Sequence, residues 1–239
     1  MTTKKKILFV VEGHREEEEL KRNILHHLNL NVEDCDIVMY GTSIHELSCL
    51  LAKPEHEEMS LTAILIKRNL IKVDTNVQLD STFSSVYLVF DFDPQYQKYN
   101  EIELINLSKR FNNETEDGML LLNYPMFESL FDIEDINNLE LFLKKKTSLV
   151  TSNEYKKIVK ARTFFKSYSG NVYKHIDDKE TFKKIAYFNL KKYQYIMKLN
   201  SYTGLNQEEL LKKQIKELST MNEFYIINTL SLLYFDYND

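Results

Sequence analysis

The feature that most limits the fold is a series of short apolar segments that alternate with stretches of helical periodicity. Segment 7–11 is wholly apolar and rich in β-branched residues, which is typical of a buried strand in a parallel sheet. Further strands are expected at 36–40, 86–90 and 119–122, and helices at 14–28, 44–52, from Pro54 to about Lys72, and 101–111. Because alternating strands and helices need crossover connections, this part predicts an α/β fold with a mostly parallel four-stranded sheet and flanking helices.

Glycine and proline are rare, with 5 Gly and 3 Pro in 239 residues. An all-β fold needs these residues for its many tight turns, so the composition disfavours it. Hydrophobic residues make up 43% and charged residues 28%, which excludes wholesale disorder and a membrane protein. Cys35 and Cys49 lack metal-ligand spacing, and no leader segment is evident. We therefore expect a reduced, cytoplasmic protein without a signal peptide or a transmembrane helix.

After about residue 140 the apolar spacing remains helical. Residues 182–197 and 210–218 mark two helices, and 224–235 is nearly all apolar. We expect an α/β domain over 1–138, followed by an all-α, basic and aromatic-rich domain over 139–239. The absence of a long linker in the sequence predicts that the two parts dock closely.

The charge differs between the two parts. Residues 1–140 hold 13 Lys and Arg against 26 Asp and Glu, whereas 141–239 hold 18 against 10. Within 144–198 the bases are interleaved with Tyr and Phe, a combination that suits nucleic acid because cations neutralise phosphates and rings stack on bases. The residues predicted to bind nucleic acid are Lys144, Lys145, Lys146, Lys156, Lys157, Arg162, Lys183, Lys184, Lys191, Lys192 and Tyr193. A solvated helix face is the alternative interpretation of these lysines.

Acidic residues stand where two of the expected strands end. Glu12 follows the first strand, and Asp91 and Asp93 follow the strand at 86–90. Ligands of open parallel sheets bind at the carboxyl ends of the strands, so these three carboxylates are expected to converge. Such a cluster is costly unless a cation occupies it or its pKa values rise, and oxygen ligands without His or Cys favour Mg²⁺ or Mn²⁺. The alternative is that these acids are simply solvated.

Motifs for several other chemistries are missing. Gly13 lacks the further glycines of a dinucleotide fingerprint, and no P-loop or Gly-x-Ser-x-Gly elbow occurs. A phosphate acceptor of the receiver type needs an acidic pair after the first strand, which the lone Glu12 does not supply. These absences disfavour the corresponding nucleotide-binding, hydrolase and phosphate-acceptor functions.

The acidic motifs resemble a known family. Val10-Val11-Glu12-Gly13 before a helix, with a later strand running into Asp91-Phe92-Asp93, resembles the Toprim domain of topoisomerases, bacterial primases, ribosomal RNA maturases and OLD-type nucleases. The resemblance covers residues 5–130 and implies that Glu12, Asp91 and Asp93 hold Mg²⁺ for phosphodiester chemistry. The spacing of Glu16 is similar to that of the OLD and RloB-like branches, and 123–128 is similar to an Asn-Pro-x-Phe-Glu segment of RloB-like proteins, with an extra Tyr before the Pro. These similarities imply roles for Glu16 and Glu128.

The function expected from these observations is a Mg²⁺- or Mn²⁺-dependent nuclease that cleaves DNA or RNA, with the basic half as its substrate platform. Glu12 or Glu16 would act as general base. The resemblance further implies antiviral defence, with an ATPase partner protein. The competing hypothesis is a non-catalytic nucleic-acid-binding or regulatory module that retains a Toprim-like sheet.

Overall fold

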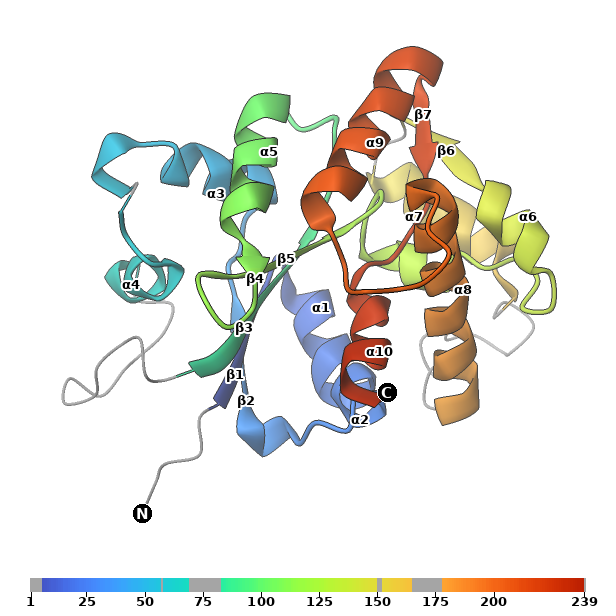
Figure 1. Cartoon of the computed structure of the whole chain (residues 1–239), viewed down its shortest axis with the longest axis horizontal. Helices are drawn as coiled ribbons and strands as arrows, with labels where there is room; N and C mark the ends of the chain where they lie inside the picture. Colours follow the sequence, from blue (N-terminus) through green and yellow to red (C-terminus); the bar gives the residue numbers. More distant parts are fainter. Residues whose placement is uncertain (1–5, 57, 69–82, 150–151, 165–177, 239) are drawn as a thin grey trace.

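A computed structural model describes residues 6–56, 58–68, 83–149, 152–164 and 178–238. Its centre is a sheet with the strand order β2-β1-β3-β5-β4 (Figure 1). The strands are β1 (Lys6–Val11), β2 (Cys35–Met39), β3 (Phe83–Asp91), β4 (Asn112–Asn113) and β5 (Gly118–Asn123). Strands β1, β2, β3 and β5 are parallel, and β4 is antiparallel to β5. The predicted α/β class with a mostly parallel sheet is thus confirmed.

The prediction of four strands was wrong by one. The additional strand, β4, consists of Asn112 and Asn113 only, which carry no apolar pattern and are depleted in strands. It forms because the chain turns back beside β5, where Asn112 pairs with Met119. The four parallel strands lie where the apolar segments predicted them.

The helices of the first part also follow their predicted positions. One helical stretch consists of α1 (His14–Glu19), a π-helical turn (Leu20–Ile24) and α2 (Leu25–His27). The others are α3 (Ile44–Leu51), α4 (Leu61–Lys67) and α5 (Glu101–Arg110), with 3-10 turns at Val32–Asp34, Pro54–His56 and Phe127–Phe131. The expected helical stretch from 69 to Lys72 lies outside the described residues.

The second part is mainly helical. Its helices are α6 (Leu139–Lys144), α7 (Ser152–Arg162), α8 (Lys179–Met197), α9 (Gln207–Met221) and α10 (Leu233–Asn238), and Leu230–Leu232 forms a 3-10 turn. The prediction that this part is all-α was wrong, because β6 (Lys146–Ser148) and β7 (Glu223–Tyr225) pair as an antiparallel ribbon. Strands of three residues are too short to show the alternation that identifies a strand in a sequence.

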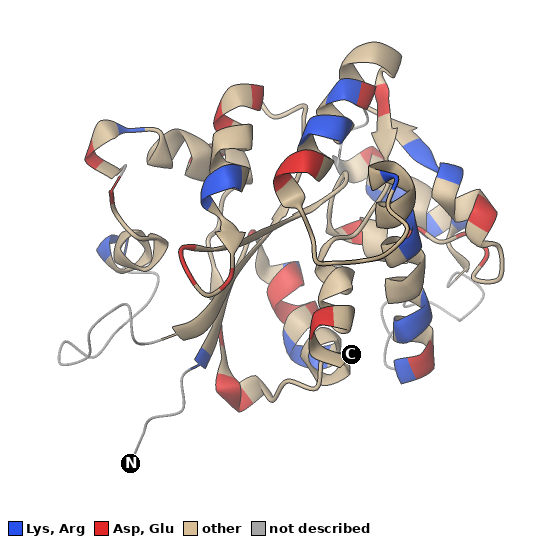
Figure 2. Ribbon diagram, in the orientation of Figure 1, with Lys and Arg blue, Asp and Glu red and all other residues tan. Residues whose placement is uncertain are grey.

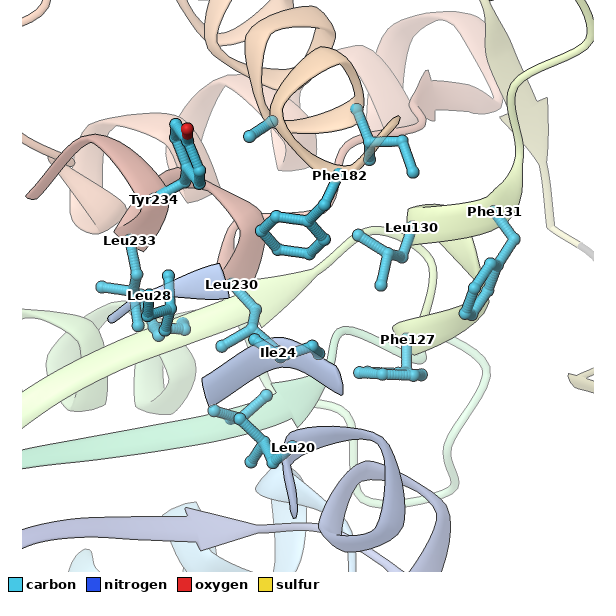
Figure 3. Close-up of a cluster of buried hydrophobic side chains, with 14 of the residues drawn as sticks. Leu20, Ile24, Leu28, Phe127, Leu130, Phe131, Phe182, Leu230, Leu233 and Tyr234 are labelled. Carbon is cyan, nitrogen blue, oxygen red and sulfur yellow. The ribbon is translucent and has the colours of Figure 1, made fainter. Parts of the chain in front are cut away.

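Two hydrophobic clusters cover the two faces of the sheet. Phe9, Val11 and Val89 face the first, which Leu20 and Phe182 complete (Figure 3). The intervening strand residues face the second, which is completed by side chains of α3, α4, α5 and α9. Each cluster takes residues from both sides of residue 138, so the C-terminal helices pack directly on the sheet. Among the helices that the structure describes, none has the length and apolar character needed to cross a membrane.

One glycine of the sheet is fixed by its surroundings. Gly118 begins β5 with a φ of 124°, a conformation that side-chain-bearing residues rarely adopt. A Cβ atom at this position would lie 2.9 Å from Cδ1 of Leu88 and 3.2 Å from Cγ1 of Val86. Glycine therefore lets β5 begin close against β3.

Candidate carboxylate site

The carboxyl ends of the neighbouring strands β1 and β3 lie at the topological switch point of the sheet, where the strand order reverses. Strand β1 lies between β2 and β3, so that Val11 is in register with Met39 on one side and with Val89 on the other. From β1 the chain proceeds to β2, whereas from β3 it proceeds to β5 on the other side. Crevices at such switch points are where open α/β sheets bind ligands. Glu12 follows β1 at this point, and Asp91 ends β3.

Glu12 is fixed against β3 through its backbone and its side chain. Its N–H donates to the carbonyl of Val89 at 3.2 Å, and its Oε2 accepts from the N–H of Asp91 at 3.2 Å. Burial raises the pKa of Glu12 from 4.5 to about 7, and the negative charges of Glu16 and Asp93 act in the same direction. The side chain therefore exchanges its proton near neutral pH.

Asp91 is buried in the site, with 8% of its surface exposed. Its Oδ1 accepts a hydrogen bond from the N–H of Phe127 at 2.8 Å. Burial raises the pKa of Asp91 well above its ordinary value, and the charges of Glu12, Glu16 and Glu128 raise it further. The carboxyl groups are thus close enough to oppose one another's ionisation.

Glu16 enters the site from the first turn of α1. Its Oε2 accepts from the N–H of Gly13 at 3.0 Å, which also caps the start of the helix. A Cβ atom at residue 13 would lie 3.1 Å from that oxygen, so glycine leaves room for the carboxylate. Burial raises the pKa of Glu16, with a further contribution from Glu128.

Glu128 brings the segment after β5 into the same site. Its carboxylate is buried and forms an ion pair with Arg15, and Nζ of Lys156 lies 3.5 Å from Oε1. Arg15 belongs to α1 and Lys156 to α7, so the two cations beside Glu128 come from separate helices. Glu128 is consequently the carboxylate of the site that is paired with cations.

Asp93 lies at the edge of the site on a constrained loop. Its φ is 29°, in the left-handed region that few residues other than glycine adopt. Nε2 of His45 lies 3.0 Å from the carbonyl oxygens of both Phe92 and Asp93, where it donates a proton and holds the loop. Burial lowers the pKa of His45, which favours its neutral form. Asp93 is half-buried and lines a small cavity with Pro125 and Phe224.

The structure thus brings together the five acids singled out in the sequence: Glu12, Glu16, Asp91, Asp93 and Glu128. Their oxygens and the absence of His and Cys from the set suit a hard cation such as Mg²⁺ or Mn²⁺, and a cation would relieve the repulsion that raises their pKa values. In the described ranges no three His, Cys, Asp or Glu side chains are already gathered in a coordination geometry. The site therefore fits a divalent cation in the type of its donor atoms and in its negative charge.

The prediction of nucleic-acid binding was wrong for three residues, whose side chains the structure shows to be buried. Lys192 is fully buried, and its Nζ donates to the carbonyls of Phe142 at 2.7 Å and Lys145 at 2.6 Å. The Lys145 side chain is buried in an ion pair with Asp132 at 2.6 Å. Tyr193 is buried, and its hydroxyl accepts from the N–H of Asn206 at 2.8 Å. These three side chains hold the helices together and are inaccessible to a phosphate or a base.

Half of the other predicted cations, four of eight, are paired with acids. Lys144 binds Glu140 and Lys146 binds Glu217, and Lys156 faces Glu128 as described. Arg162 donates from Nε to Asp132 at 2.8 Å, and the hydroxyl of Tyr155 donates to the same carboxylate at 2.8 Å. Of the predicted set, Lys157, Lys183 and Lys184 are exposed and Lys191 is half-buried, none with an acidic partner among the described residues. The basic surface is therefore smaller than the sequence suggested.

Two functional contacts have no signal in the sequence. Arg15 and Glu128 are 113 positions apart, and His45 reaches a loop 48 positions away. Only the pairing of β1, β3 and β5 brings these segments together.

No protein-family model, curated protein or solved structure matches this chain.

Proposed function

We propose that the protein is a Mg²⁺- or Mn²⁺-dependent phosphodiesterase that cleaves nucleic acid. The observation that carries the proposal is the gathering of Glu12, Glu16 and Asp91 at the switch point of the sheet. Glu16 and Asp91 are buried, Glu12 is half-buried, and the pKa values of all three are raised. Keeping several carboxyl groups buried side by side costs stability. A protein that bears this cost at the usual ligand-binding edge of the sheet is best explained by a cation bound in function.

The side chains of the carboxylate site have different roles in this proposal. Glu12, Asp91 and Asp93 would hold the metal ion, which when bound stabilises the charge that develops on the phosphate oxygens. Glu16, whose pKa is raised, or Glu12 would accept a proton from an attacking water. Arg15 and Lys156 supply positive charge beside the cluster. The His45 contacts fix the loop that carries Asp93.

The resemblance of the acidic motifs to Toprim domains supports the same chemistry. Glu12 and the Asp91-Phe92-Asp93 segment, on which the resemblance rests, lie on adjacent parallel strands. Under this proposal the resemblance to OLD and RloB-like proteins extends to a role in antiviral defence with an ATPase partner protein. That extension depends on analogy and is separate from the chemistry of the site.

A non-catalytic module is the second candidate. The observation in its favour is that Glu12, Glu16 and Asp91 each accept a hydrogen bond from a backbone N–H. Such bonds stabilise carboxylates without a cation. In this case the protein would bind nucleic acid through its basic half and would not cleave it.

Cleavage assays separate the two candidates. Wild-type protein is incubated with single- and double-stranded DNA, tRNA and total RNA in Mg²⁺, in Mn²⁺ and in EDTA. The Asp91→Asn variant keeps an oxygen to accept from Phe127 but loses its charge, so cleavage is expected to vanish while nucleic-acid binding persists. Glu17→Gln, which changes an acid on the same helix as Glu16 that is paired with Lys21, serves as the control and is expected to cleave normally.

Thermal unfolding in the presence of metal provides the second measurement. Mg²⁺ or Mn²⁺ is expected to raise the melting temperature of wild type and of Glu17→Gln, but not that of Asp91→Asn. Equal cleavage by wild type and Asp91→Asn would refute the proposed site. Nucleic-acid binding without cleavage and without a metal-dependent shift would favour the non-catalytic module.

A further inference from the structure

Four cations without an acidic partner among the described residues line one groove. It has a volume of about 720 Å³ and lies between α6, α8, α9 and β7. Lys191, Lys198, Lys213 and Lys216 line it, with Glu217 as its carboxylate. Figure 2 shows the lysines of α8 and α9, two of the helices that line it, in blue.

The four lysines have no acidic partner among the residues that the structure describes. Nζ of Lys191 donates to the amide of Gln194 at 3.1 Å, and Nζ of Lys213 donates to the carbonyl of Ile196 at 3.3 Å, so both partners are neutral. Glu217 is engaged by Lys146 at 2.6 Å. The groove therefore carries an uncompensated positive charge, which attracts a polyanion.

An exposed aromatic ring stands among these lysines. Tyr195 lines the groove with 45% of its surface exposed. Its ring meets that of Tyr225 at a centroid distance of 6.1 Å and an angle of 78°, and Nζ of Lys146 lies 4.6 Å from the centre of the Tyr225 ring. These contacts hold Tyr195 in place, so that little side-chain entropy is lost when a planar group stacks on it.

The groove is adjacent to the carboxylate site across a single strand. Tyr225 of β7 faces the groove, whereas the preceding residue, Phe224, lines the small cavity beside Asp93 and packs on Phe92 at 5.5 Å between ring centroids. Neighbouring residues of a strand point to opposite faces, so β7 separates the two features. The groove and the cavity beside Asp93 therefore lie on opposite sides of β7.

We propose that this groove binds single-stranded nucleic acid, with Tyr195 stacking on a base and Lys191, Lys198, Lys213 and Lys216 neutralising phosphates. A single strand fits better than a duplex because it exposes the faces of its bases, whereas a duplex offers mainly its phosphates. The inference rests on the proposed function only in identifying the bound strand as the substrate. Binding itself requires no metal.

Fluorescence anisotropy with a labelled oligo(dT) and a labelled oligo(U), in EDTA, measures the binding. Tyr195→Ala is expected to weaken it roughly 5- to 100-fold at high salt. Tyr187→Ala is the matched control, because Tyr187 lies on the same helix with 42% exposure and outside the groove lining. The centre of its ring lies 5.4 Å from Nζ of Lys191, a contact whose loss leaves the charge of the lysine in place. The control is expected to bind like wild type.

The salt dependence tests the lysines. Lys198→Gln with Lys216→Gln is expected to flatten the slope of log K against log salt by about 1.4, since each lost phosphate contact changes it by about 0.7. Lys109→Gln with Lys212→Gln removes the same charge from two lysines that are paired with Glu208 and lie outside the groove lining, and is expected to leave the slope unchanged. Equal effects of the two pairs, or of the two tyrosine variants, would overturn the assignment to the groove.

Two further measurements test whether the ligand of the groove is a protein, and whether the groove and the carboxylate site act independently. Competition by a poly-glutamate peptide at the same charge concentration, with no effect of Tyr195→Ala, would identify an acidic protein surface as the ligand and refute the inference. Hydrolysis of bis(p-nitrophenyl) phosphate, a diester too small to need the groove, tests the carboxylate site alone. The groove variants are expected to retain this activity and Asp91→Asn to lose it, so either proposal can fail without the other.

Discussion

Removing one charge from the carboxylate site should stabilise the metal-free protein. Glu12 ionises with a pKa of about 7 in the folded protein, compared with 4.5 as its ordinary value. Glu12→Gln keeps the shape of the side chain and an oxygen to accept from the N–H of Asp91, but cannot ionise. The substitution therefore isolates the cost of the negative charge.

The sign and size of the expected change in the free energy of unfolding follow from proton linkage. Because the folded-state pKa is raised, this carboxyl group contributes no penalty below about pH 4.5, and the penalty grows as the pH rises towards 7. The difference between 4.5 and about 7 corresponds to about 3 kcal/mol when Glu12 is ionised, taken as an upper bound because its neighbours titrate with it. For a chain of this length, about 3 kcal/mol raises the melting temperature by roughly 6 to 12 °C.

Urea and thermal unfolding in EDTA, at pH 5 and pH 8, measure the effect. Glu12→Gln is expected to be more stable than wild type at pH 8 and nearly equal to it at pH 5. Glu17→Gln, which loses a carboxylate whose pKa is lowered by Lys21, is expected to show no such gain. If Glu12→Gln were destabilised equally at both pH values, the argument from buried charge would be wrong.

Three further predictions concern residues outside the carboxylate site. Asp132→Ala is expected to lose about 3 to 5 kcal/mol in urea unfolding, because Lys145 and Arg162 would lose their buried carboxylate and keep only the more exposed Glu134 as a shared acidic partner. Lys192→Met should cost less at pH 7 than at pH 10, because burial lowers the pKa of Lys192 and the folded protein disfavours its charged form; a cost that does not change with pH would contradict this. Gly118→Ala should lose about 1 to 3 kcal/mol through its positive φ and the contact with Leu88, and an unchanged melting temperature would show that β5 can shift.

The strands and the acids at their ends could be predicted because each depends on a local pattern. Segment 7–11 is apolar throughout, since both faces of β1 are covered, and Glu12 follows it directly. The same reasoning identifies β3 and Asp91. The Arg15–Glu128 ion pair could not be predicted, because nothing in either segment specifies a partner 113 positions away. Long-range ion pairs are set by strand order, which a single sequence does not reveal.

The errors in the basic half have a different cause, because part of the signal was present. Net charge over 144–198 says nothing about the side of a helix on which each lysine lies, whereas helical spacing does. Lys192 stands four residues after Phe188 and four before Ile196, both buried, so the spacing places it on the inner face of α8. Lys191 stands midway between Tyr187 and Tyr195, both exposed, on the outer face. Applied to each lysine in turn, the 3.6-residue period would have excluded Lys192 and directed attention from Tyr193 to Tyr195.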